Sequence, residues 1–404
     1  MDHQRRQILR AALAAGIAGS GGLLASRVSF GATGSGEQRL VFVLLRGALD
    51  GLAAVPAIGD PDYLRWRGEL DLSHAPAAHR LDDTFALHPS LGFLAELWGQ
   101  KQLAVAHAVA TPYRERSHFD AQDVLESGYT RPHASQSGWL NRALAALPTS
   151  SRGSGRNAGV ALGANIPLVM RGPTAVASWS PARLPDLESD TLQRIAQMYS
   201  RDELLSQRLA DALAADEMAG EASGMNARGA RAAGVAQLSQ TARATAGFLA
   251  QPEGPRVAVF ETTGWDTHAN QGADQGALAL RLAGLDAGLR ALRDSLGSSW
   301  DHTVVLVATE FGRTVAVNGT RGTDHGTGAA AFVLGGAVQG GRMIGQWPGL
   351  ASSALYQGRD LQPTTDLRSV IKTVLRDHLQ VQPRSLDNEV FPESASATYL
   401  QGLI

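Results

Sequence analysis

The strongest constraint on the fold is an alternation of short apolar runs with longer helical patterns. Residues 39–45 (RLVFVLL) and 303–309 (TVVLVAT) are apolar on both faces, which is typical of strands buried in a parallel sheet. Leucines from Leu278 to Leu296 recur at spacings of four and three, which predicts an amphipathic helix. Further strands are predicted at 102–109, 256–260 and 329–334, and further helices at 87–98, 117–127 and 367–379. This order predicts an α/β fold with a mostly parallel central sheet flanked by helices.

The N-terminal segment, residues 1–33, is typical of a targeting sequence rather than of a folded element. Arg5 and Arg6 form an arginine pair, and the weakly apolar stretch after them is diluted by glycines. This stretch is too short and too glycine-rich for a good membrane span. The pattern resembles a twin-arginine export signal, which predicts transport of the folded protein by the twin-arginine translocase to the periplasm or the medium. No other stretch predicts a stable membrane span.

The segment 184–250 differs in composition from the rest of residues 34–404. It is rich in alanine, arginine, acidic residues, leucine and glutamine, with almost no β-branched runs, and several glycines interrupt it. We expect a helical insertion of several helices that caps a single α/β domain.

Composition excludes several classes of chemistry. The 404 residues include no cysteine, which removes disulfides, thiolate metal sites and cysteine nucleophiles. Lysine occurs only at Lys101 and Lys372, so a catalytic lysine has almost no candidates. The formal net charge is −2, which disfavours a nucleic-acid partner.

Ionisable residues collect after the predicted strands. Ligands of open α/β sheets bind at the carboxyl ends of the strands, so side chains from these loops are expected to meet. Five loops contribute: Arg46 and Asp50; Arg114, Arg116, Ser117 and His118; Asp266 and His268; Glu310 and Arg313; Asp324 and His325. Carboxylate and imidazole together suit Zn²⁺, Mn²⁺ or Mg²⁺, with imidazole favouring zinc.

Each of these residues also has a purely structural interpretation. Asp50 is typical of a carboxylate that caps the next helix or turn, and Ser117 of a helix N-cap. His118 is compatible with a structural histidine, and Asp324 with His325 is compatible with a hydrogen-bonded turn. The coincidence of five such loops favours a shared site over five unrelated structural roles.

The same loops carry a family resemblance. The motifs LLRGALDG (44–51), RSHFDAQD (116–123), GWDTH (264–268), TEFGR (309–313) and TDHGTG (323–328) resemble a bacterial family labelled domain of unknown function 1501. The resemblance spans residues 38–380, and family members often begin with twin-arginine signals. The family is similar to the alkaline phosphatase and sulfatase superfamily, which implies an alkaline-phosphatase-like sandwich.

The superfamily resemblance assigns roles to individual residues. Its acidic residue after the first strand corresponds to Asp50, and its nucleophile at a helix start corresponds to Ser117 or His118. The Asp and His that bind one metal in that superfamily correspond to Asp266 and His268.

Two further positions correspond to the superfamily only in part. Glu310 stands where the superfamily has an Asp, but Phe311 stands where it has a metal-binding His. His325 matches the His that precedes a strand. The resemblance thus implies a second metal site that is weakened, or rebuilt with Asp324. With no cysteine for a formylglycine, a phosphate ester is favoured over a sulfate ester.

The leading hypothesis is an exported metal-dependent hydrolase or transferase acting on a small anionic ester. One or two divalent ions (Zn, Mn, Mg or Ca) are expected. Ser117 is the expected nucleophile. The metal-binding set is Asp50, Asp266, His268, Glu310, Asp324 and His325, and the catalytic set adds His118, Arg46, Arg116 and Arg313.

Two other hypotheses remain open. One is a non-catalytic periplasmic envelope protein that keeps part of the metal site, which Phe311 favours. The other is different metal chemistry on a single ion held by Asp266, His268 and His325.

Overall fold

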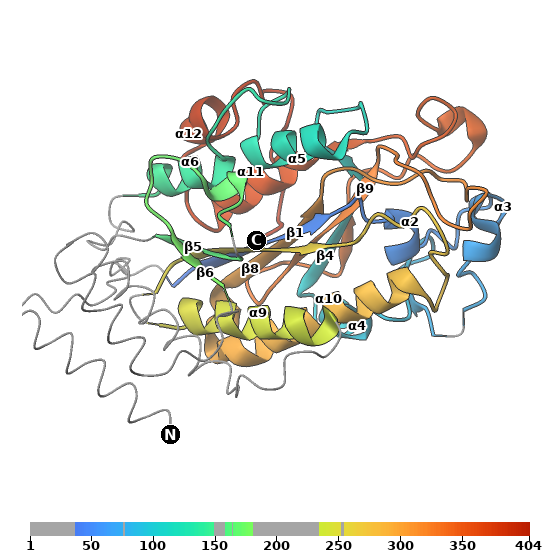
Figure 1. Cartoon of the computed structure of the whole chain (residues 1–404), viewed down its shortest axis with the longest axis horizontal. Coiled ribbons are helices and arrows are strands. Elements are labelled where there is room, and N and C mark those ends of the chain that lie inside the picture. The colour runs from blue at the N-terminus through green and yellow to red at the C-terminus, as the bar shows by residue number, and fades with distance from the viewer. Residues whose placement is uncertain (1–36, 76, 149–157, 164, 181–233, 252–253) are drawn as a thin grey trace, which may run out of the picture.

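A computed structural model describes residues 37–75, 77–148, 158–163, 165–180, 234–251 and 254–404. A large mixed sheet runs through the described part of the chain, with helices on both faces (Figure 1). Its strands are β1 (Arg39–Arg46), β4 (Leu103–Ala110), β5 (Gly159–Leu162), β6 (Ala177–Trp179), β7 (Val257–Thr263), β8 (Thr303–Thr309), β9 (Ala329–Leu334), β10 (Arg342–Ile344) and β11 (Thr365–Asp366). A separate hairpin pairs β2 (His79–Arg80) with β3 (Ala86–Leu87).

The strand order is β10-β4-β9-β8-β1-β7-β5-β6, with β11 also on β4. The central strand β1 is parallel to both neighbours, with Phe42 opposite Val259 on β7 and Leu306 on β8. Strand β9 runs antiparallel to β8 and to β4. The predicted α/β fold with a mostly parallel central sheet is therefore confirmed.

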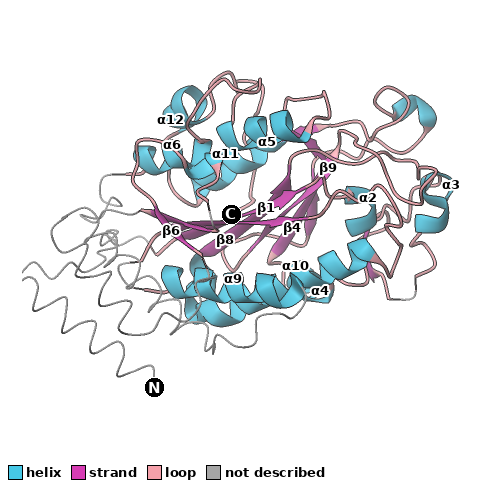
Figure 2. Cartoon of the chain, in the orientation of Figure 1, coloured by secondary structure: helices cyan, strands magenta, loops and turns pink. Residues whose placement is uncertain are grey.

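Helices cover both faces of the sheet (Figure 2). The helices are α2 (Gly51–Ala54), α3 (Tyr63–Arg67), α4 (Gly92–Gly99), α5 (His118–Ser127), α6 (Trp139–Ala146), α9 (Gly234–Leu249), α10 (Ala277–Leu296), α11 (Leu367–Asp377) and α12 (Pro383–Ser385). One face carries α4, α9 and α10, and the other carries α5, α6 and α11. Successive side chains of β1 point to opposite faces of the sheet, because the strand is pleated. Val41 and Val43 therefore pack in one apolar core, and Leu40 and Phe42 pack in the other.

The predicted helix at 87–98 begins later than expected. Ala86 and Leu87 belong to the β2–β3 hairpin, and α4 starts only at Gly92. The physical reason is Pro89, which disfavours helical backbone at the residue before it.

The predicted export signal (1–33) and most of the predicted insertion (184–250) lie outside the described residues. The end of that segment forms α9, which packs on α10 and against β5 and β7. Residues 234–249 therefore belong to the helical layer of the main domain. In the described ranges, no helix is long and apolar enough to cross a bilayer.

Candidate metal centre

The predicted loops meet at one edge of the sheet. Parallel strands β1, β7 and β8 all end there, so the residues that follow each of them are neighbours. Because β9 runs the opposite way, its beginning lies at the same edge, and this brings His325 to the loops that follow the other strands. The first helical residue of α5, His118, completes the group.

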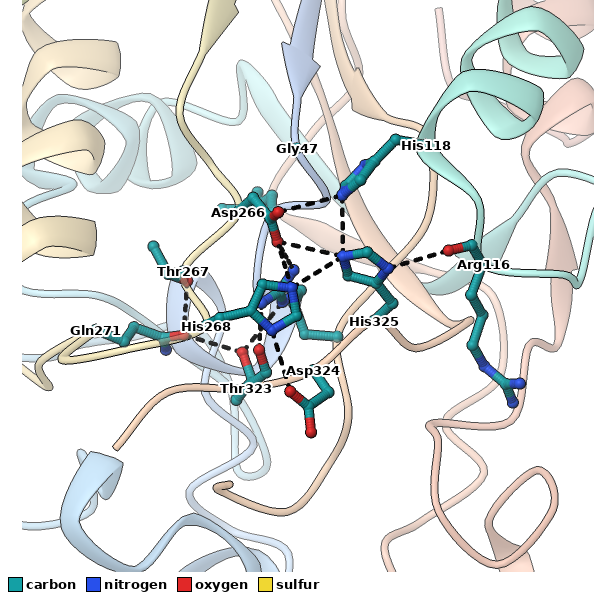
Figure 3. A network of polar contacts seen from close by, with 12 residues as sticks. Gly47, Arg116, His118, Asp266, Thr267, His268, Gln271, Thr323, Asp324 and His325 are labelled. Atoms are coloured by element: carbon teal, nitrogen blue, oxygen red, sulfur yellow. Dashed lines mark hydrogen bonds and ion pairs between the residues drawn. The ribbon is translucent and has the colours of Figure 1, made fainter. Parts of the chain in front are cut away.

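Three imidazoles converge on one carboxylate (Figure 3). The Nε2 atom of His325 lies 3.0 Å from Nε2 of His118 and 3.0 Å from Nε2 of His268. The Asp266 carboxylate lies 3.0 Å from Nε2 of His268, 3.3 Å from that of His325 and 3.4 Å from that of His118. We call these four residues the His-Asp cluster.

The other ring nitrogen of each histidine is bonded to a group that can only accept a hydrogen bond. Nδ1 of His118 lies 2.8 Å from a Glu310 oxygen, and Nδ1 of His268 lies 3.0 Å from an Asp324 oxygen. Nδ1 of His325 lies 3.0 Å from the backbone carbonyl of Arg116. The acceptors therefore place the proton of each neutral ring on Nδ1 and leave a lone pair on Nε2.

This arrangement fits a bound cation. Three lone pairs and a carboxylate that face one another at 3.0–3.4 Å repel unless a proton or a metal ion lies between them. Donor atoms around a tetrahedral zinc ion are about 3.3 Å apart, from metal–ligand bonds of about 2.0–2.1 Å. Histidines that bind metal usually donate their other N–H to a carboxylate or a carbonyl, as all three do here.

The charge of Asp266 is held by Arg313. Burial raises the pKa of Asp266, but the hydrogen bond and charge of Arg313 and the nearby His268 and His118 outweigh it and lower the pKa. Arg313 is buried and also donates to the carbonyl of Thr323, so its guanidinium is fully engaged inside the protein. Asp266 is consequently an ionised carboxylate held in a set orientation.

Glu310 orients His118 rather than joining the cluster. One oxygen accepts from His118, from the Gln122 amide at 3.0 Å and from the Gly47 backbone at 2.8 Å, and the other accepts from Thr309 at 2.9 Å. Burial raises the pKa of Glu310, but these hydrogen bonds outweigh it, and the pKa lies below its usual value. Glu310 is therefore an ionised acceptor whose first oxygen is occupied by three donors, while the second shares the Thr309 hydroxyl with the Leu45 carbonyl.

Gly47 is required for this contact. Its φ of +118° is accessible to glycine, and a Cβ there would lie 2.7 Å from the backbone nitrogen of Asp266. The end of β1 can thus approach the segment that carries Asp266 only without a side chain.

Phe311 forms an apolar wall beside the cluster. Its ring stacks on His118 at a centroid distance of 4.9 Å and lies 5.2 Å from the ring of His325. The phenyl ring has no atom that could bind a metal ion on this side. The packing also restricts the rotation of both imidazoles.

Asp50 lies away from the cluster and has a structural role. It is the N-cap of α2, with one oxygen accepting from the backbone of Leu52 and Ala53. The other oxygen pairs with buried Arg67 at 2.5 Å and accepts from Gln271 at 2.7 Å. This geometry does not support its expected part in metal binding, because both oxygens of this buried carboxylate already accept two hydrogen bonds each.

Ser117 is the N-cap of α5, but it makes no side-chain capping bond. Its hydroxyl interacts with that of Tyr113. In the ranges that the structure describes, no hydrogen bond links it to the His-Asp cluster. His118, one position further along, is the residue that the helix start directs into the site.

The arginines predicted to hold an anion are paired inside the protein. Arg46 bonds to Glu126 at 2.8 Å and to Glu261 at 2.7 Å. Arg116 bonds through its side chain to Asp360 at 2.8 Å, and Figure 3 shows that side chain pointing away from the cluster. With Arg313 bound to Asp266, all three guanidinium groups are engaged by carboxylates.

The remaining predicted residue, Asp324, and two histidines outside the site have identified hydrogen-bond partners. Asp324 bonds to His268 and to the Asn318 amide, and the Asn318 bond is the first cause that lowers the pKa of Asp324. Outside the site, the rings of His88 and His107 bond to the backbone carbonyls of Ala273 and Val55 and are structural.

Two supporting residues were missed by sequence reasoning. Gln122 bonds to Glu310, and its place four residues after His118, on the same face of a predicted helix, is a signal that was available. Asn318 lies in a loop, and no sequence pattern marks it.

These features define an α/β protein with an imidazole–carboxylate cluster at the carboxyl edge of its parallel strands. The chain belongs to the family described as a protein of unknown function (DUF1501), which matches residues 37–388. No match is found among curated proteins.

Two solved structures show distant similarity. One, described as Ps i-CgsB in complex with k-i-k-neocarrahexaose, has 10% identity and a TM-score of 0.39, covering 90% of this chain and 77% of the other. The second is a protein in the alkaline phosphatase superfamily from Vibrio parahaemolyticus, with 12% identity and a TM-score of 0.32. It covers 85% of this chain and 71% of the other.

Proposed function

We propose that this protein is a metal-dependent hydrolase or transferase acting on a phosphate ester, with a sulfate ester as the less favoured substrate. The observation that carries the proposal is the convergence of three Nε2 atoms and the Asp266 carboxylate while every Nδ1 faces an acceptor. His118, Asp266 and His325 each offer a ligand atom within 4.8 Å of the other two, and His268 joins through Asp266 and His325.

One ion per chain is the favoured number. Phe311 occupies the side on which a second site would need a ligand, and one oxygen of Glu310 is already occupied by His118, Gln122 and Gly47. A divalent cation of the zinc type would supply Lewis-acid polarisation of an ester oxygen. Glu310 and Asp324 keep two imidazoles in the required tautomer, and Arg313 holds Asp266 ionised.

A role for Ser117 as nucleophile is less well supported than ligand roles for the histidines. Its hydroxyl interacts with Tyr113, and within the described residues no hydrogen bond joins that hydroxyl to the side chains of the cluster. The proposal therefore assigns the attack to water.

The test combines metal analysis with turnover. We expect about one ion per chain in the purified protein and hydrolysis of p-nitrophenyl phosphate after loading with Zn²⁺, Mn²⁺, Mg²⁺ or Ca²⁺. His325→Ala should lower metal affinity on the order of 100-fold or more and abolish turnover. Ser117→Ala should keep both the metal affinity and the turnover of the wild type. His74→Ala, at an exposed position, is the matched control. Wild-type protein that binds no metal would refute the proposal.

A second candidate is a non-catalytic metal-binding envelope protein. It is favoured by the pairing of Arg46, Arg116 and Arg313 with internal carboxylates, because these groups are then not available to an anionic substrate. Stoichiometric metal without turnover of any phosphate or sulfate ester would select it.

Export by the twin-arginine translocase is part of the proposal. It rests on the Arg5–Arg6 pair and the glycine-rich apolar stretch that follows. Fractionation of the native host should place the wild-type chain in the periplasm or the medium, and Arg5→Lys combined with Arg6→Lys should retain it in the cytoplasm.

A further inference from the structure

One arginine beside the cluster is not paired with a carboxylate at hydrogen-bond distance. Arg359 donates from Nη2 to the backbone carbonyl of His325 at 2.7 Å. Its nearest ion-pair partner is Asp360, at 3.7 Å from Nε, which is too long for a hydrogen bond. The side chain of Arg359 is 43% exposed, so part of it is accessible to a ligand from solvent.

Asp360 explains why Arg359 keeps its charge available. This carboxylate is fully buried, and its other oxygen is bonded to Arg116 at 2.8 Å. Arg116 is therefore the hydrogen-bonded partner of Asp360, whereas Arg359 lies 3.7 Å from the other oxygen of this carboxylate.

Backbone hydrogen bonds hold Arg359 in place. Tyr356 and Asp360 bond to each other in both directions and close a tight turn around it. The carbonyl of Arg359 accepts from the backbone of Val315, which ties this turn to the segment that carries Arg313. The backbone of Arg359 is thus fixed, and the bond from Nη2 to the His325 carbonyl places the guanidinium beside a residue of the cluster.

Asp324 is an exposed carboxylate beside the cluster. Its side chain is 50% exposed, whereas the charge of Asp266 is compensated by Arg313. An exposed carboxylate repels an anionic ester, so a positive group near Asp324 favours binding of the ester. The charge of Arg359 reaches Asp324, where it is one of the minor causes of the lowered pKa.

We infer that Arg359 is the specificity-determining residue that binds the anionic oxygens of a phosphate or sulfate ester at the His-Asp cluster. This inference rests on the proposed function. The planar guanidinium offers two donors to two oxygens of a tetrahedral anion, which is the geometry that arginine provides and lysine does not.

The test uses inorganic phosphate as the probe on zinc-loaded protein, with binding measured by titration calorimetry and metal content measured first. Arg359→Met should keep its metal and its unfolding midpoint, while the Kd for phosphate rises about 10- to 100-fold. Arg359→Lys should lose a smaller part of the affinity. Arg384→Met, an exposed arginine on α12, is the matched control and should bind as wild type does.

The outcomes separate this inference from the proposed function. Unchanged phosphate affinity in Arg359→Met, with metal retained, would overturn the role of Arg359 and leave the proposed function standing. Loss of metal in Arg359→Met would also overturn it, since the residue would then act through the carbonyl of His325. A parallel titration with sulfate separates the two ester classes: wild-type protein that holds metal but binds neither anion would overturn the inference and the substrate class together.

Discussion

At the scale of single residues, the site depends on groups that do not belong to the cluster. The carbonyl of Arg116 fixes the tautomer of His325. Arg116 has a φ of +61°, a backbone conformation that residues other than glycine rarely adopt. Its guanidinium is bonded to buried Asp360. The carboxylate thus acts on His325 through the backbone of Arg116, and it does so without touching the cluster.

Replacing Asp360 with Asn should therefore weaken metal binding. The amide removes the charge that holds Arg116, and groups that orient a metal-binding histidine typically change affinity about 10- to 100-fold. Competition with a chromogenic chelator would measure the effect on Zn²⁺ affinity. Asp62→Asn is the control, because Asp62 pairs with exposed Arg65 on α3, away from the cluster. Equal zinc affinities for Asp360→Asn and wild-type protein would contradict this role.

The choice between Ser117 and His118 shows what sequence reasoning could not decide. The motif located both at a helix start, and adjacent helical residues point about 100° apart around the axis. A difference of one residue in where α5 begins therefore decides which side chain enters the site. The observed start at His118 settles it in favour of the imidazole.

At the scale of elements, the strands were predictable because burial on both faces leaves few alternatives to an apolar run. All five predicted runs form strands of the sheet, and their beginnings agree within one residue. The direction of β9 was not predictable from its composition, because Ala329–Leu334 is apolar in either orientation. The role of Asp50 was likewise hidden, because Arg67 and Gln271 approach it from other parts of the chain.

Helix α11 holds the C-terminal segment through one buried lysine. Lys372 is 1% exposed and lies 2.6 Å from an Asp387 oxygen, and it donates to the carbonyls of Ser394 and Ala397. Its ammonium also lies 4.8 Å from the centre of the Tyr399 ring. This group ties residues 387–399 to the main domain.

Lys372→Met should destabilise the fold by about 3 kcal/mol, because it leaves these buried acceptors without a donor. Lys101→Met is the matched control. Lys101 is exposed, so its replacement should change the free energy of unfolding by less than about 0.5 kcal/mol. Urea unfolding measures both values, and limited proteolysis should cut Lys372→Met earlier within residues 387–404. Equal stability of the two variants would contradict this role.

At the scale of the whole molecule, two buried histidines make stability depend on pH. Burial lowers the pKa of His107 and of His378 to about 4, although each ring bonds to a backbone carbonyl. In the unfolded chain the same groups titrate near 6.5. The unfolded state therefore takes up protons first, and the contribution to stability is complete above pH 6.5 and is lost as the pH falls toward 4.

For each of these histidines, the free energy of unfolding should fall by about 2 kcal/mol when the pH is lowered from 7.5 to 5. Urea unfolding at the two pH values measures this loss. His107→Gln and His378→Gln should each reduce the difference between the two pH values, whatever their effect at pH 7.5. His74→Gln, at an exposed position, should leave it unchanged. A pH dependence that is the same in all four proteins would assign acid sensitivity to other groups.

The site as a whole was predictable in location but not in its internal arrangement. Loop positions follow from strand order, so Asp266, His268, Glu310, Asp324 and His325 were found together. The division between ligands and orienting groups depends on side-chain directions within a few ångströms. No periodic pattern in the sequence indicates in which direction these side chains point.

The imidazoles of His118 and His325, which meet at 3.0 Å, are 207 positions apart in the chain. A growing polypeptide cannot bring them together until the strands from β1 to β8 have been synthesised. Uptake of a cation at this point would therefore mark the completion of folding, and fragments that end before His325 should remain unable to retain it.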